Sequence, residues 1–463
     1  MGIINHCQKR NDMKRRFFFT TSILGGAGLT LGIAPLTSSL TGCSNEAKKP
    51  NYTPAELGMF SFAEKAPDGK PLKGALIGCG GRGSGAAINF LMAGPNLSII
   101  ALADVLKDRL EDCRQLLKEK SHNDVPDVHC YIGFDAYKKV ISMPEVDVVL
   151  ICTPAYFHPY MCKEAVEAGK HVFLEKPAGV DPVGIRTLIA AGKQAEVAGL
   201  TIVTGNQRRH SRDYWEAYIQ MKNGLIGDII SVSCHFNTSR GWHINRKAEW
   251  SDMEYNLRNQ AVIKWVAGDH VLELGVHNID VISWFTGMNP TTVDGFGGCA
   301  QRLFGDTFDF FSGDYTFDNG KRMLATTRQI AGCHVTVGEK ILGTKGIVIL
   351  NDQVNIVDYE GNTLWAYDYE KNPIKNPYEQ EHIHLVESIR LNKKINQAID
   401  LANSTLVAIM GREAAYTGKL IKWDEMMSSD LRYGPEETDI SKFEMGPLPF
   451  YKEGEVPRPG RAV

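Results

Sequence analysis

The sequence predicts an α/β protein whose first domain is a doubly wound parallel sheet and whose second domain is rich in β-strands. Three observations lead to this prediction. A glycine-rich turn separates a short apolar run from a small-residue helix start in "GALIGCGGRGSGAAINFLMAG" (74–94). Strand-like apolar runs then alternate with helical segments as far as residue 177, which is typical of a parallel sheet. From about residue 228, β-like runs follow one another with turn signals between them.

Length and charge limit the possible classes of protein. A chain of 463 residues, 43% hydrophobic and 23% charged, is long enough to bury a sizeable core and to form two domains. The formal net charge of −3 provides no basic excess, and no stretch interleaves basic and aromatic residues. Nucleic acid is therefore not an expected partner.

Residues 1–42 read as an export signal that precedes the folded protein. "RRFFF" at 15–19 resembles a twin-arginine signal, and "LTGC" at 40–43 resembles a lipobox in which Cys43 would be lipidated. The alternative is a chance arginine pair in an ordinary cleaved signal peptide. We expect an exported lipoprotein, periplasmic or at the cell surface, that is bound to a membrane by this anchor. Residues 43–72, polar and rich in Pro and Lys, are expected to form a tether.

The glycine-rich turn fits the pattern G-x-G-x-x-G. Gly78 would permit the tight turn, Gly80 the approach of a pyrophosphate, and Gly83 the packing of helix on strand. Gly81 and Arg82 lie inside the pattern and are counted with the cofactor contacts. Phosphates would lie at the N-terminus of the helix, where free N–H groups favour anions.

The next strand-like run, "LSIIALADV" (97–105), carries an acidic residue at its end. Asp104 stands where an acid can accept hydrogen bonds from the ribose of a dinucleotide, which favours NAD over NADP. The simpler alternative is a turn residue that closes a strand. The order of strand, turn, helix, strand and acid predicts a Rossmann domain over 73–205.

The alternation continues with a helix near 106–120, a strand at 146–154, a helix at 159–170 and a strand at 171–177. Ligands of doubly wound sheets bind beyond the carboxyl ends of the strands. The residues that fall there are Thr153, Pro154, Glu175 and Lys176.

Four motifs in this order resemble the Gfo/Idh/MocA family, which is named after glucose-fructose oxidoreductase and inositol dehydrogenase: "GCGGRG", "CTPAYFH", "EKP" and "ELGVHNID". The resemblance implies a second α/β domain with an open, mostly antiparallel sheet, expected over 206–440, and late helices that return to the first domain. It also implies a homo-oligomer, a dimer or tetramer, assembled through the sheet. Residues 441–463 are expected to be an extended tail.

The same resemblance assigns roles to a few residues. Lys176 would lie between nicotinamide and substrate, and His277 would be the acid/base, since an imidazole exchanges protons near neutral pH. Glu273 takes the place of the family's usual aspartate, one methylene longer. Two alternatives stay open: a helix face whose polar groups satisfy one another, and a metal site formed by His270, Glu273 and His277. The resemblance implies no metal.

Further candidate contacts come from two other segments. His158 and the "TGNQRRH" segment (204–210), with Asn206, Gln207 and Arg208, are expected near the cofactor. The insertion-like stretch 240–270 is rich in aromatic, Arg and His side chains, which suits stacking on a sugar and binding its hydroxyls. Its candidates are Trp242, His243, Tyr255, Arg258 and His270. Alternatively, these aromatic residues only fix a long loop.

We therefore expect an NAD-dependent oxidoreductase that transfers hydride between nicotinamide and a ring carbon of a sugar or glycoside. A redox-neutral glycoside hydrolase is the alternative, because an exported enzyme has no evident route for recycling free NADH. A third reading is a non-catalytic sugar-binding lipoprotein that keeps the fold alone.

Overall fold

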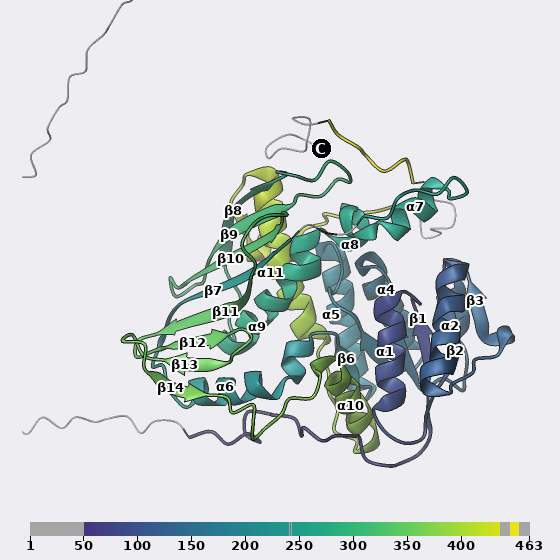
Figure 1. Cartoon of the computed structure of the whole chain (residues 1–463), viewed down its shortest axis with the longest axis horizontal. Helices are drawn as coiled ribbons and strands as arrows, with labels where there is room; N and C mark the ends of the chain where they lie inside the picture. The colour runs from purple at the N-terminus through teal and green to yellow at the C-terminus, as the bar shows by residue number, and fades with distance from the viewer. Residues whose placement is uncertain (1–50, 240, 242, 436–444, 453–463) are drawn as a thin grey trace, which may run out of the picture. The chain divides into compact units, whose positions relative to one another are not determined.

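The computed structural model describes residues 51–239, 241, 243–435 and 445–452 (Figure 1). The first sheet has six parallel strands in the order β3-β2-β1-β4-β5-β6. The strands are β1 (Leu72–Ile77), β2 (Leu97–Asp104), β3 (Cys130–Ile132), β4 (Val148–Ile151), β5 (His171–Leu174) and β6 (Ile202–Thr204). The strand order reverses between β1 and β4, which creates a crevice at their carboxyl ends.

Helices cover both faces of this sheet. For this reason every residue of β4 is apolar and buried, as are all residues of β5 after its first. They are α1 (Gly81–Met92), α2 (Lys107–Ser121), α3 (Ala136–Ile141), α4 (His158–Glu167) and α5 (Pro182–Val197). The predicted Rossmann domain is confirmed, and its strands and helices begin and end within a few residues of the expected positions.

The second sheet has nine strands in the order β14-β13-β12-β11-β7-β10-β9-β8-β15. All its pairings are antiparallel except that of β7 with β10. The strands are β7 (Ile229–Thr238), β8 (Thr292–Gly298), β9 (Phe310–Thr316), β10 (Arg322–Gln329), β11 (Thr336–Gly343), β12 (Ile347–Leu350), β13 (Asn355–Val357), β14 (Thr363–Ala366) and β15 (Ile421–Lys422). The mostly antiparallel sheet is confirmed; β11, β14 and β15 were not predicted.

Two late helices return to the Rossmann domain, as expected. The helices of this half are α6 (Arg212–Lys222), α7 (Asp252–Arg258), α8 (Lys264–Ala267), α9 (Val276–Thr286), α10 (Pro377–Arg390), α11 (Ala398–Thr417) and α12 (Trp423–Ser428). Figure 1 shows α10 beside β6 and α1. Before and within α11, Gln397 accepts the Thr204 N–H and the Thr405 hydroxyl accepts the Ala178 N–H. No helix among the described residues is long and apolar enough to cross a membrane.

Residues 51–71 differ from the predicted tether, because they pack on the folded body. The Phe60 ring lies parallel to that of His210 at 5.3 Å, and the Ser61 hydroxyl donates to Glu387. Ala66 is buried. The tether prediction is therefore wrong for this part of 43–72, and the export signal with Cys43 lies outside the described residues.

The described part of the tail, residues 445–452, also packs on its own chain. Met445 and Leu448 are buried, and the Pro449 carbonyl accepts the Gly305 N–H.

Candidate functional site

The glycine turn after β1 owes its shape to two glycines. Gly78 has φ +93°, which favours glycine, and a Cβ on Gly83 would lie 1.8 Å from the Gly78 carbonyl oxygen. Gly83 therefore lets α1 start directly against the turn. The first turn of α1 has no side-chain cap and no acidic residue, so its N–H groups are free to bind an anion.

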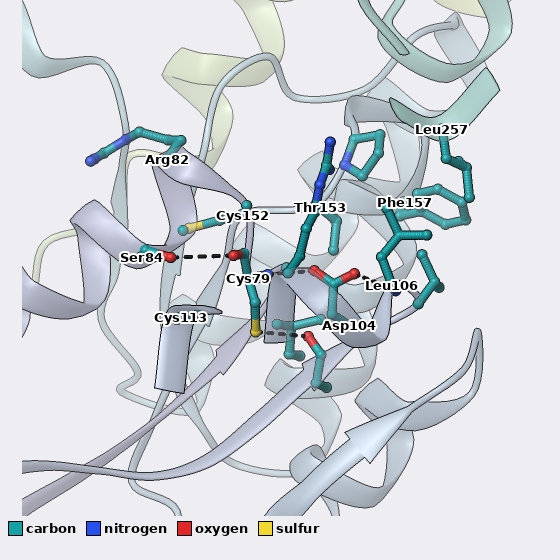
Figure 2. Close-up of a pocket in the computed structure, with 18 of the residues that line it drawn as sticks. Cys79, Arg82, Ser84, Asp104, Leu106, Cys113, Cys152, Thr153, Phe157 and Leu257 are labelled. Carbon is teal, nitrogen blue, oxygen red and sulfur yellow. Dashed lines mark hydrogen bonds between the residues drawn. The ribbon is translucent and has the colours of Figure 1, made fainter. Parts of the chain in front are cut away.

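Asp104 at the end of β2 holds this turn in place. Its carboxylate accepts the N–H groups of Cys79 at 2.6 Å and Leu106 at 2.7 Å, as Figure 2 shows. Burial raises the pKa of this carboxyl, while the two N–H donors act in the opposite direction. Asp104 also lines the adjoining cavity, so one residue both braces the turn and faces the ligand space.

A cavity of about 670 Å³ extends from the glycine turn along the carboxyl ends of the strands. Gly78, Gly80, Gly81, Arg82 and Gly83 line it at one side. Thr153 and Pro154 line it after β4, and Glu273 lines it from the second domain. The uncapped helix, the close-packed glycines and the acid of β2 fit the pyrophosphate and ribose of a dinucleotide.

Lys176, Glu273 and His277 lie together, where the two domains meet. The Lys176 ammonium donates to the Glu273 carbonyl at 2.6 Å and lies 3.3 Å from its carboxylate. Burial, and then the nearby cations Lys176 and Arg208, hold the pKa of His277 well below its ordinary value. Its Nδ1 is buried without a hydrogen-bond partner among the described residues. The site thus combines a cation, a carboxylate and a neutral imidazole.

The backbone around Glu273 is not the regular helix that the spacing suggested. Residues Val271–Gly275 form one π-helical turn before α9 begins, so Glu273 is offset from the regular helical face. Asp280 turns away to a buried ion pair with Arg209.

His270 is a structural residue and not a substrate contact. Its ring nitrogens lie within hydrogen-bond distance of Asp269, the Phe308 carbonyl and Thr327, and it is 1% exposed. These internal contacts of His270 do not favour the alternative metal site, and no cluster of three or more metal-ligating side chains occurs in the described ranges.

Arg82, which lines the cavity, forms an ion pair with Glu175, which does not line it. The Arg82 guanidinium pairs with Glu175 and donates to Glu381 of α10 at 2.6 Å. Figure 2 shows its side chain directed away from the other cavity residues. Arg82 therefore connects the glycine turn with the residue before Lys176, and its contact with the cofactor stays a prediction. Glu381 lies 299 residues after Arg82 in the sequence, and no sequence motif predicted the contact between them.

His158 is likewise internal. It is buried, with Nε2 at 2.7 Å from the Thr153 carbonyl and Nδ1 at 2.6 Å from the Pro177 carbonyl. It fixes the two loops that carry Thr153 and Lys176 and makes no contact with the cavity.

No residue of the 204–210 segment is among those that line the dinucleotide cavity. Arg208 forms a buried ion pair with Glu339 of β11, and burial raises the pKa of Glu339 to about 7 despite that partner. The polar side-chain atoms of Asn206 and the Oε1 atom of Gln207 are buried without partners among the described residues. Such amides can receive polar groups of a ligand.

The aromatic insertion mostly packs on itself. Tyr255 is 3% exposed and lies 2.9 Å from Nε2 of His243. Arg258 pairs with Asp108 of the Rossmann domain and lies over the Trp250 ring. These contacts agree with the alternative that the aromatic residues fix the loop, and the predicted sugar contacts stay a prediction. Trp242 lies outside the described residues.

Three of the cavity residues that sequence reasoning missed are Arg109, Leu257 and Gln260. Arg109, in the first turn of α2, lines the cavity, and its guanidinium lies 3.6 Å from the position that a Cβ on Gly80 would take. The sequence feature that could have indicated it is a basic residue five positions after Asp104. Leu257 and Gln260 reach the cavity from the insertion, for which the sequence offered no such signal.

Comparisons with known proteins agree with this geometry. Residues 72–202 match the profile described as "Oxidoreductase family, NAD-binding Rossmann fold", and residues 214–349 match the "GFO/IDH/MocA C-terminal domain". Together the matched residues make up more than half of the chain.

Three individual proteins illustrate the range of relatives. Glycosyl hydrolase family 109 protein 4 of Phocaeicola vulgatus is 26% identical over 55% of this chain, which spans only 51% of that protein's length. The scyllo-inositol 2-dehydrogenase (NAD(+)) of Bacillus subtilis is 23% identical over 76% of this chain and 96% of its own. The crystal structure of aldose-aldose oxidoreductase from Caulobacter crescentus shares the fold, with a TM-score of 0.60, 20% identity and coverage of 76% of this chain and 100% of its own.

Proposed function

Because the chain belongs to the Gfo/Idh/MocA family of NAD-binding oxidoreductases, we propose that it oxidises or reduces a ring carbon of a sugar or glycoside. The single observation that carries this proposal is that the Lys176 ammonium contacts Glu273, which lines the dinucleotide cavity, and lies near the buried imidazole of His277. The glycine turn, Asp104 and Thr153 would hold the NAD. When bound, NAD supplies a hydride acceptor at its nicotinamide ring.

Side chains of the protein would stabilise the charge that develops on the substrate and accept its hydroxyl proton. The Lys176 ammonium would stabilise the negative charge that develops on the substrate oxygen. His277 is suited to accept the hydroxyl proton, because its lowered pKa keeps the imidazole neutral near pH 7. Glu273 would position Lys176 through the two contacts described above.

Hydride transfer in two variants tests these roles. We would screen sugars and glycosides for reduction of bound NAD by the near-ultraviolet absorbance of NADH, then compare Lys176→Met and His277→Asn. Each is expected to lose about 10²-fold or more in the hydride-transfer rate while keeping NAD affinity. Near-normal turnover in both variants would reject the assigned roles.

A redox-neutral glycoside hydrolase is the second candidate, favoured by the similarity to the Phocaeicola glycosyl hydrolase family 109 protein. In this cycle a glycoside hydroxyl is oxidised, the aglycone is eliminated, water adds, and the carbonyl is reduced again. The bound NAD returns to its starting state. Free aglycone without net NADH would identify the hydrolase, whereas net NADH with an intact glycoside would identify the dehydrogenase.

The proposal extends to location and assembly. The twin-arginine and lipobox resemblances support export of the protein with a lipid on Cys43. Mass spectrometry of the mature N-terminus tests this proposal. An unmodified N-terminus upstream of Cys43 would refute lipidation. The proposed homo-oligomer is tested by light scattering of the purified protein, in which a monomer at working concentration would refute it.

A further inference from the structure

We propose that residues 252–262 of the second domain, here called the retaining segment, form an outer wall of the dinucleotide cavity that must open before the cofactor leaves. The retaining segment comprises α7 and the short 3₁₀ turn Gln260–Val262. The inference deepens the proposed function, on which it rests, because a cofactor recycled in place must stay bound between turnovers.

The retaining segment faces the cavity with three side chains. Leu257, Gln260 and Ala261 line the same cavity as the glycine turn and Asp104. Figure 2 shows Leu257 beside Phe157, on the opposite side of the view from Arg82. A dinucleotide in this cavity would lie between the ends of the Rossmann strands and the retaining segment.

Gln260 could accept a hydrogen bond from such a ligand. Its Oε1 atom is buried and has no hydrogen-bond partner within the described part of the chain. A buried amide oxygen without a partner costs free energy, which a ligand hydroxyl or amino group would recover. A dinucleotide carries both kinds of donor, on its riboses and on its amide and adenine groups.

An ion pair fastens the retaining segment to the Rossmann domain. One terminal nitrogen of Arg258 lies 2.8 and 2.7 Å from the two carboxylate oxygens of Asp108, which is in the first turn of α2. The Arg258 side chain is only 10% exposed, and it is further held by Glu254 at 2.7 Å and by the Trp250 ring at 4.4 Å. This ion pair joins the second domain to the Rossmann domain beside the cavity that Leu257 and Gln260 line.

Apolar packing supports the segment from both sides. Toward the Rossmann domain, Val105 and Phe134 pack against the cluster that contains Leu257. On the other side, Met445 and Leu448 of the tail belong to the same cluster, and Asn256 donates to the Gly446 carbonyl at 2.7 Å. The tail thus acts as a strap that presses the retaining segment against the cavity.

Release of bound NADH tests the proposal. The full-length protein would be loaded with NADH, freed of excess by rapid desalting, and mixed with a large excess of NAD; the decay of bound-NADH fluorescence gives the dissociation rate. Arg258→Met, and a chain that ends at residue 444, are expected to release NADH about tenfold faster than wild type. Gln260→Leu is expected to weaken NADH binding without loosening the ion pair.

The matched control is Arg322→Met, which removes an Arg–Asp pair on an exposed strand; its NADH release is expected to equal that of wild type. Circular dichroism and thermal unfolding establish that each variant is folded. Wild-type release rates in both folded Arg258→Met and the shortened chain would overturn the inference. If the variants release NADH faster but wild type converts no sugar or glycoside, the retaining segment stands and the proposed function fails.

Discussion

Replacing Gly83 by alanine tests how the cofactor turn is built. The new Cβ would lie 1.8 Å from the Gly78 carbonyl oxygen, 3.0 Å from its carbon and 3.3 Å from the Cβ of Cys152. Carbon–oxygen contacts are normally about 3.3 Å or more, so α1 and the turn must separate by roughly 1.5 Å. The conflict is with backbone, which no rotamer change relieves. We expect a loss of about 3 kcal/mol in the free energy of unfolding, at the upper end of overpacking effects.

Urea titration followed by tryptophan fluorescence, together with an NADH binding titration, measures both consequences. Gly81→Ala is the matched control, because a Cβ there meets no atom within 4 Å and the residue is the first of the same helix. It is expected to change stability by about 0.5 kcal/mol or less. If Gly83→Ala unfolds at the wild-type urea concentration and binds NADH with unchanged affinity, the close approach of helix and turn is not what shapes the site.

Two further predictions concern buried charges of the second domain. Asp280→Asn leaves the Arg209 guanidinium without its main buried partner, and urea titration is expected to give a loss of about 3 kcal/mol; wild-type stability would contradict this. Glu339 has a raised folded-state pKa of about 7 against 4.5, so its contribution to stability is complete below pH 4.5 and is lost as pH rises through 7. Relative to Glu339→Gln, wild type should lose roughly 3 kcal/mol between pH 4.5 and 7.5, and a pH-independent difference would refute the assignment.

The Rossmann half could be predicted closely because its signals are local. The glycine turn, the buried strands and the acid at Asp104 each depend on residues near one another in sequence, and the parallel sheet follows from their alternation. Lys176 and His277 were found through family motifs, and the structure brings them near each other beside Glu273, which lines the cavity.

The errors arose where a side chain's partner is distant in sequence. The composition of the insertion suggested a sugar surface, but it could not reveal that Arg258 meets Asp108, 150 residues earlier. In the same way, Arg82 stands inside a phosphate-binding motif, and its two acidic partners, Glu175 and Glu381 of α10, are distant in sequence. For buried charges the partner decides the role, and sequence spacing does not identify the partner.

Glu273, in the π-helical turn Val271–Gly275, contacts Lys176 through both its backbone and its side chain. Here the offset backbone turn places the Glu273 carbonyl 2.6 Å and its carboxylate 3.3 Å from the Lys176 ammonium. Backbone and side chain of one residue thus hold the cation together, which leaves His277 free of an acidic partner. Shortening Glu273 to aspartate would withdraw its carboxylate from the Lys176 ammonium and leave only the backbone carbonyl contact.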